Sequence, residues 1–288
     1  MYNMRITMLN THVWSTISDL VIGTLTIPYL FFPAIAGTPL GFFNYFEISP
    51  FIQTYIATCC IAEVGSSIVL LFENRYFYAV SEKYRINNPI YRNLFTIINC
   101  SIAFLFIIPL YFNIPDQILS KFLIIISYEC LSNVINTHQI TILTMDPKIV
   151  GILFIFITVF LFGQCIFFFV YSAISLYISS KNTILSERTK YLQRKYFISV
   201  CIQISVPMLL VVLPVYYFTF SIIMDYYNQD LNNLSFMIIS MHGFVSTITT
   251  IFIYDHYRNY TFNLFSCRKD RRTSIISLKT IGETTFVR

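Results

Sequence analysis

Two carboxylates lie inside stretches of the chain that are otherwise apolar. Asp19 lies within residues 8–32, and Glu63 lies within PFIQTYIATCCIAEVGSSIVLLFENR, which ends at Arg75. An ionisable side chain at such depth is costly in lipid and by default faces the interior of a helical bundle. Both lie about ten residues, or ~15 Å, from the same side, so they could face one another as a protonated pair or around a cation or waters. The alternative is that Ser, Asn or backbone groups satisfy each one separately.

The triplet Glu73-Asn74-Arg75 ends the second of these stretches with an abrupt change to polar residues. An acid next to an arginine at the end of a central helix suits a charge lock, in which one pairing holds a closed state and another an open state. The alternative is that the triplet marks the water interface, as polar residues do at any helix end.

The sequence carries no pattern typical of catalysis or of a bound metal. Its four histidines are too scattered for a metal site, and it has no phosphate-binding loop, nucleophile elbow or HExxH motif. Its seven cysteines show no metal or redox spacing, and we expect no structural disulfide. We therefore predict no catalytic residues, no metal and no cofactor.

The composition indicates an integral membrane protein. Of 288 residues, 56% are hydrophobic and only 11% are charged, whereas a soluble domain carries about 25% charged residues. The mean hydropathy is +0.66. The net charge of +5 is spread over separate loops between apolar spans, which is not the signature of a nucleic-acid partner. A soluble enzyme is disfavoured.

The apolar stretches predict an all-α fold, a polytopic membrane bundle over residues 1–261 with a tail at 262–288. Pro28 should kink the first span, and the Pro/Gly-punctuated segment after it should be a turn. In the long loop at 113–148, the apolar part KFLIIISYECL is too short to count as a span. The six spans are expected at about 8–32, 50–72, 93–112, 149–178, 196–224 and 234–254.

The fifth span contains Pro207 and Pro214, so we expect it to bend. The two prolines could form a hinge that swings the inner end of this span. A static kink is the alternative.

The basic residues predict the orientation of the chain in the membrane. Seventeen of the 19 Lys and Arg residues fall on one side of the predicted spans, and only Lys121 and Lys148 fall on the other. This places both visible termini in the cytoplasm. The segment TFNLFSC after Arg258 could form a short interfacial helix that carries a lipidated Cys267.

Four stretches together resemble the nematode seven-helix chemoreceptors of serpentine receptor class H. They are PYLFFPAIAGTPLG, LFENR, the paired prolines of the fifth span, and HGFVSTITTIFIYDHYRNYT. Two features depart from the family. Its members begin with a further transmembrane helix, so the spans here would be helices two to seven. They also tend to have proline before the final Tyr-Arg, where this chain has His256.

The resemblance implies a G-protein-coupled receptor in the plasma membrane of sensory neuron cilia. Its partners would be a small odorant-like ligand, a heterotrimeric G protein and the lipid bilayer. Glu73, Asn74 and Arg75 match the family's intracellular motif, and Arg75 would release its pairing on activation and engage the G protein α subunit. The ligand cavity would open to the outer half of the bundle, with contact residues that the sequence does not identify.

Two other functions remain open from the sequence. One is a small transporter or channel of six helices, although no span carries regularly spaced arginines and the prolines do not recur in two matching halves. The other is a truncated receptor remnant that does not signal.

Overall fold

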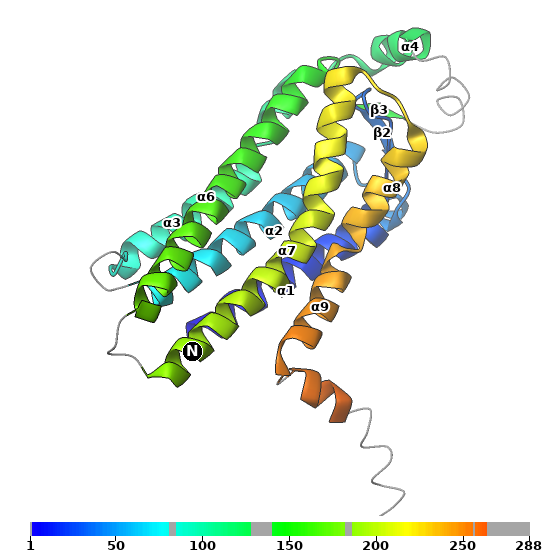
Figure 1. Ribbon diagram of the computed structural model, residues 1–288. Coiled ribbons are helices and arrows are strands. Elements are labelled where there is room, and N and C mark those ends of the chain that lie inside the picture. The colour runs from blue at the N-terminus through cyan, green and yellow to red at the C-terminus, as the bar shows by residue number, and fades with distance from the viewer. Residues whose placement is uncertain (1, 81–84, 128–139, 182–185, 256, 264–288) are drawn as a thin grey trace, which may run out of the picture.

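The computed structural model describes residues 2–80, 85–127, 140–181, 186–255 and 257–263. Long helices pack side by side, and a small sheet lies at one end of the bundle (Figure 1). The long helices are α1 (Tyr2–Leu20), α2 (Pro50–Ala79), α3 (Pro89–Leu105), α6 (Pro147–Lys181) and α7 (Glu187–Met224), followed by α8 (Gln229–Ser240) and α9 (His242–Ile253). The shorter elements are η1 (Val21–Thr26), η2 (Phe42–Phe46), η4 (Ile108–Asn113), α4 (Gln117–Ser127), β1 (Pro28–Leu30), β2 (Ala36–Pro39) and β3 (Thr141–Ile142).

α2 is the central helix of the bundle. It packs against α1, α3, α6 and α7, and 72% of its most apolar window is buried, against 17–29% for the other three long apolar helices. A helix that is covered on every side is apolar on every side. The polar side chains that α2 does bury, Glu63 and Glu73 to Arg75 among them, are therefore the ones that need an explanation.

Within the described residues, four helices are long and apolar enough to cross a membrane, and α8 with α9 make a fifth crossing if they form one span bent by 43°. α1 packs along α2 and α9 in the same bundle, but it does not pass the same test within the described part of the chain. Its buried face carries hydroxyl groups, those of Thr11, Ser15 and Ser18. Together with Asn10, His12 and Asp19 in the same helix, these residues lower its hydropathy.

The segment from Pro28 to Gly41 corrects the expectation of a kinked helix followed by a turn. The first helix ends in the π-helical turn η1, and Ile27 adopts a left-handed φ of 42°. Pro28 then begins β1, where it pairs with Pro39 of the antiparallel β2. Proline has no N–H for a sheet ladder and is tolerated at strand ends. β3, from the distant 113–148 loop, pairs with the other side of β2.

α4 includes most of the apolar part of that loop, which the sequence indicated was too short for a span. It is tied to the sheet through Gln117, whose Nε2 donates to the Ile142 carbonyl and whose Oε1 accepts from the Ile142 N–H, both at 3.0 Å. It is too short to cross a membrane. The remainder of KFLIIISYECL, residues 128–131, lies outside the described residues.

α7 is bent rather than straight (Figure 1), as the sequence led us to expect. Pro207 and Pro214 both lie within this continuous helix, and each removes one backbone hydrogen bond. Whether the bend moves stays a prediction.

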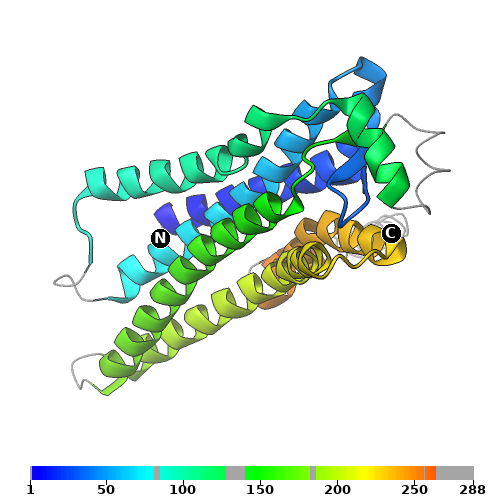
Figure 2. The same cartoon turned by 90° about the horizontal axis from the view of Figure 1, so that it is seen from above.

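The two ends of the bundle are named here by what they carry. The sheet end holds β1 to β3 and α4, and the basic end holds the end of α2, the start of α3, the end of α6 and the start of α7 (Figures 1 and 2). The cations Arg75, Arg92 and Lys181 lie on the elements of the basic end.

Candidate functional site

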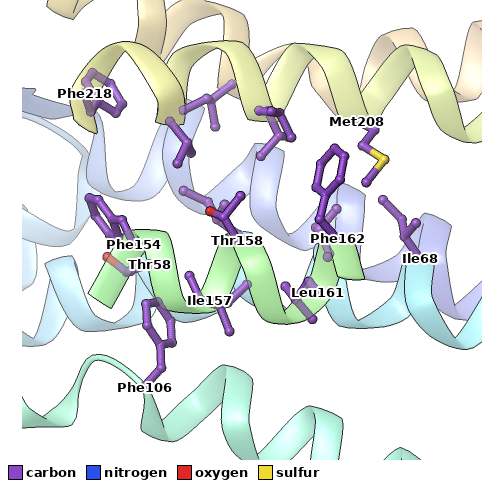
Figure 3. Close-up of a pocket in the computed structure, with 18 of the residues that line it drawn as sticks. Thr58, Ile68, Phe106, Phe154, Ile157, Thr158, Leu161, Phe162, Met208 and Phe218 are labelled. Carbon is purple, nitrogen blue, oxygen red and sulfur yellow. The ribbon is translucent and has the colours of Figure 1, made fainter. Parts of the chain in front are cut away.

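An apolar cavity of about 170 Å³ lies between α2, α6 and α7, with walls from β1 and α8 toward the sheet end (Figure 3). Its lining contains only two hydroxyl groups, those of Thr58 and Thr158. Ligand pockets are typically apolar with a few polar groups that fix orientation. The cavity therefore has the chemistry of a site for a small, mostly apolar molecule. The lining residues labelled in Figure 3 are Thr58, Ile68, Phe106, Phe154, Ile157, Thr158, Leu161, Phe162, Met208 and Phe218.

A second cavity, of about 80 Å³, lies between the sheet, the first turns of α2 and the start of α6. It shares part of its wall with the first cavity. Leu30, Phe32, Thr58 and Phe154 line both. These four side chains are therefore the partition between an inner cavity and an outer one at the sheet end.

Glu73 is paired across helices at the basic end. Its carboxylate accepts two hydrogen bonds from Arg92 of α3, from Nε to Oε1 and from Nη2 to Oε2, both at 2.8 Å. The Arg92 guanidinium also stacks over the ring of Phe77, 4.0 Å from its centroid. A bidentate pair of this kind is among the stronger and more directional polar contacts in proteins.

Asn74 joins this pair to the first helix. Its Oδ1 accepts from Arg92 Nη2 at 3.3 Å, and its Nδ2 donates to Thr7 Oγ1 of α1 at 3.0 Å. Glu73, Asn74 and Arg75 are each 8% exposed or less, and α2 continues beyond them to Ala79. The triplet is therefore buried among neighbouring helices and does not form the end of α2.

Arg75 points to a different neighbour from Glu73. Its side chain hydrogen-bonds the hydroxyl of Tyr254, which follows α9, and that hydroxyl donates to Gln203 Oε1 of α7 at 2.9 Å. We call Glu73, Asn74, Arg75, Arg92, Tyr254 and Gln203 the polar hub. Because of these contacts, the end of α2 is linked to α1, α3, α7 and α9 at once.

An exposed ion pair lies next to the hub, at the residue that follows Tyr254. Lys195 of α7 donates to Asp255 at 2.9 Å, and Arg258 also contacts Asp255. The hydrogen bond from Lys195, followed by the two positive charges, lowers the pKa of the Asp255 carboxyl. The contact fastens α7 to the segment after α9, but exposed pairs contribute little to stability.

Asp19 is bound to the junction of α8 and α9. Its oxygens accept from the N–H groups of Gly243 at 3.2 Å and Phe244 at 3.0 Å, and Oδ1 lies 2.9 Å from His242 Nδ1. The carboxylate thus caps the N-terminus of α9, where free N–H groups and the helix dipole favour a negative charge.

The proposed direct pair of Asp19 and Glu63 is wrong. Glu63 is 1% exposed, and its carboxyl group shares a hydrogen bond with the Cys100 thiol rather than with Asp19. Its electrostatic neighbours are the thiols of Cys59, Cys60 and Cys100. Asp19 is satisfied elsewhere because α1 presents it to α9. No group of His, Cys, Asp and Glu in the described ranges could hold a metal ion.

Sequence reasoning missed four of the residues that complete these contacts: Arg92, His242, Gln203 and Tyr254. Arg92 was assigned to a basic loop, although it lies one turn inside a helix that begins at Pro89. His242 was set aside as scattered, although a histidine within a long apolar run must be satisfied by a buried partner. Cys267 lies outside the described residues, so its lipidation stays a prediction.

The part of the chain that is similar to known proteins includes the residues of both the cavity and the hub. Residues 1–267 match the family model for the serpentine type 7TM GPCR chemoreceptor Srh. The chain is also similar to serpentine receptor class H-72 of Caenorhabditis elegans, with 22% identity over 271 residues. The aligned region makes up 94% of this chain and 78% of that receptor.

Proposed function

The chain belongs to the Srh family of serpentine seven-transmembrane chemoreceptors, and on that premise we propose that it couples a small apolar ligand to a heterotrimeric G protein. The ligand occupies the 170 Å³ cavity, and the G protein binds at the basic end. The basic end faces the cytoplasm, because loops rich in Lys and Arg stay on that side, and the protein resides in the plasma membrane of sensory cilia.

The observation that carries this proposal is that two continuous helices, α2 and α7, each contribute residues to both the cavity and the hub, only a few residues apart. On α2, Ile68 lines the cavity and Glu73 belongs to the hub. On α7, Met208 lines the cavity and Gln203 belongs to the hub. Each interval is five residues, or ~7.5 Å of helix. A ligand that shifts α7 against α2 therefore strains contacts in the hub.

In the resting state the hub holds these helices together. Glu73 and Asn74 bind Arg92, and Arg75 binds Tyr254. Activation releases Arg75 from Tyr254, and the freed guanidinium contacts the G protein α subunit. Pro207 and Pro214 allow the basic end of α7 to swing outward, since the helix already lacks backbone hydrogen bonds there.

The first test replaces the acid of the hub. Glu73→Gln keeps the shape of the side chain but removes the charge that Arg92 binds, so the closed state loses stability. We expect basal nucleotide exchange on a panel of Gα subunits to rise by roughly fivefold or more, as expected for a coupling of 1–3 kcal/mol.

The matched control is Glu47→Gln, which removes an exposed acid at the sheet end, away from the end given to the G protein. It should leave basal exchange unchanged at equal surface expression. Equal basal exchange for Glu73→Gln and the native protein would contradict the role given to the hub.

A further inference from the structure

The cavity is long and narrow. The residues of α2 that line it run from Thr58 to Ile68, and those of α7 run from Met208 to Phe218. Each of these intervals is ten residues, or about 15 Å of helix. A cavity of about 170 Å³ is only slightly larger than one that holds benzene. Spread over this length, the same volume suits a slender chain better than a ring.

Thr158 offers the cavity an unused hydroxyl group. Threonines in helices commonly donate to the carbonyl four residues earlier, and Thr54, Thr58 and Thr219 all do so. The Thr158 side chain lies among the cavity residues in Figure 3 and makes no hydrogen bond with any described residue. It can therefore donate to an oxygen of the ligand without breaking an existing bond.

One side chain of the partition between the two cavities, Phe154, is held by apolar packing alone. Phe32 stacks on Phe218 at 4.6 Å, and its carbonyl accepts from Asn232 at 3.1 Å. Leu30 is held in the sheet, and Thr58 is bonded to its own helix. Phe154 has no ring partner in the part of the chain that the structure describes. It packs against the hydrophobic core through apolar contacts alone, so truncating it breaks no hydrogen bond, ring stack or strand pair in the wall.

Thr158 and Phe154 lie on the same face of α6, one turn apart. One turn is ~5.4 Å, and a van der Waals contact with the Phe154 ring takes ~3.5–4 Å of it. An oxygen bound at Thr158 therefore has room for only one or two carbons on the side toward Phe154. On the other side Phe162 also lies one turn from Thr158 and narrows the cavity, but the lining of α6 continues to Cys165, about two turns away.

Building on the proposed function, we propose that the ligand is a slender apolar chain with one hydrogen-bond-accepting oxygen near one end. Thr158 binds that oxygen, and Phe154 limits the short side of the molecule. The chemical class is that of simple aliphatic ketones and esters. Phe154 and Thr158 are thus the residues that determine specificity.

The test uses isomers that differ only in where the oxygen stands. Binding of 2-, 3- and 4-octanone and of octane is measured as thermal stabilisation of the purified full-length receptor in lipid nanodiscs. For the native protein we expect 2-octanone to bind best and 4-octanone least, by several-fold per step. Phe154→Ala joins the two cavities and should bring 4-octanone level with 2-octanone or above it.

Thr158→Val keeps the shape of the side chain but removes the donor, so it should weaken every ketone by about three- to tenfold and leave octane unchanged. Thr158→Ser should restore ketone binding. Phe156→Ala is the matched control for Phe154→Ala, because Phe156 is 51% exposed and does not line the cavity. It should keep the native order. Phe154→Leu, a smaller change, should give an intermediate order if the alanine variant is too unstable to assay.

Failure of this inference is separate from failure of the proposed function. If no octanone stabilises the native protein, or if the isomer order is the same in the native protein and in both Phe154 variants, the inference is wrong whether or not the protein signals. If the octanones bind in the predicted order but never alter nucleotide exchange on any Gα subunit, the inference stands and the proposed coupling is wrong.

Discussion

At the scale of single residues, Glu73 and Arg75 of the hub are close in sequence but contact different helices on opposite sides of α2. Glu73 and Arg75 are two positions apart in α2, which turns their side chains about 200° apart around the helix axis. Glu73 meets Arg92 of α3, whereas Arg75 meets Tyr254 beside α9. Each charge therefore fastens a different wall of the bundle to α2, and each contact can break without the other.

The geometry of the Glu73 pair leads to a prediction for Arg92→Lys. Lysine keeps the charge but cannot form the two parallel hydrogen bonds or stack flat on Phe77. We expect basal nucleotide exchange between that of the native protein and that of Glu73→Gln, with a loss of thermal stability of about 1 kcal/mol. Arg188→Lys, at an exposed position, is the control for stability and should leave it unchanged. An Arg92→Lys protein that matches the native one in both assays would show that the charge alone matters.

At the scale of elements, the break between α8 and α9 depends on a side chain from the start of the chain. Asp19 of α1 supplies the cap that the N-terminus of α9 lacks within its own helix. Glycine at position 243 makes this approach possible, since a Cβ there would lie 2.5 Å from Asp19 Oδ2. The cap at this break therefore comes from α1 rather than from the residues of α9.

This leads to a prediction for Gly243→Ala. The added methyl group should push the Asp19 carboxylate off the cap and destabilise the protein by about 1.5–3 kcal/mol, the range for hydrogen bonds to a charged group. Gly163→Ala is the matched control in another helix, since a Cβ there would meet nothing within 4 Å. It should stabilise by up to about 1 kcal/mol. Thermal unfolding in nanodiscs measures both. Equal melting temperatures for the two variants would contradict the role of Asp19 as a cap.

At the scale of the whole molecule, the apolar stretches predicted the helical bundle. They did not predict which side chains pair between its helices. Glu73 to Arg75 could be singled out because charge is costly at that depth. The pairing of Arg92 with Glu73, and of His242 with Asp19, depends on how far each helix is rotated about its axis. That rotation cannot be read from residue types and spacing alone. The sheet was missed because β1 is three residues long and β3 comes from a segment over a hundred residues away.

A cavity could be expected from the sequence, but the residues that line it could not be predicted. The resemblance implied a ligand cavity in the outer half of the bundle but identified no contact residues. The two hydroxyl groups that distinguish the cavity come from α2 and α6, which lie side by side only after folding. Phe154 could not be told apart from Phe156 in an unbroken apolar helix, although only one of them faces the cavity.

The central claim is that an occupied cavity changes what the basic end does to a G protein. The measurement is nucleotide exchange on a panel of Gα subunits by the purified receptor in nanodiscs, with and without 2-octanone, for the native protein and Arg75→Ala. Thermal shift on the same samples reports binding. We predict that the ketone binds both proteins, that it changes the exchange rate with the native protein by about fivefold or more, and that Arg75→Ala removes this change. An exchange rate that stays the same on every Gα subunit while the ketone is bound to the native protein would contradict the account.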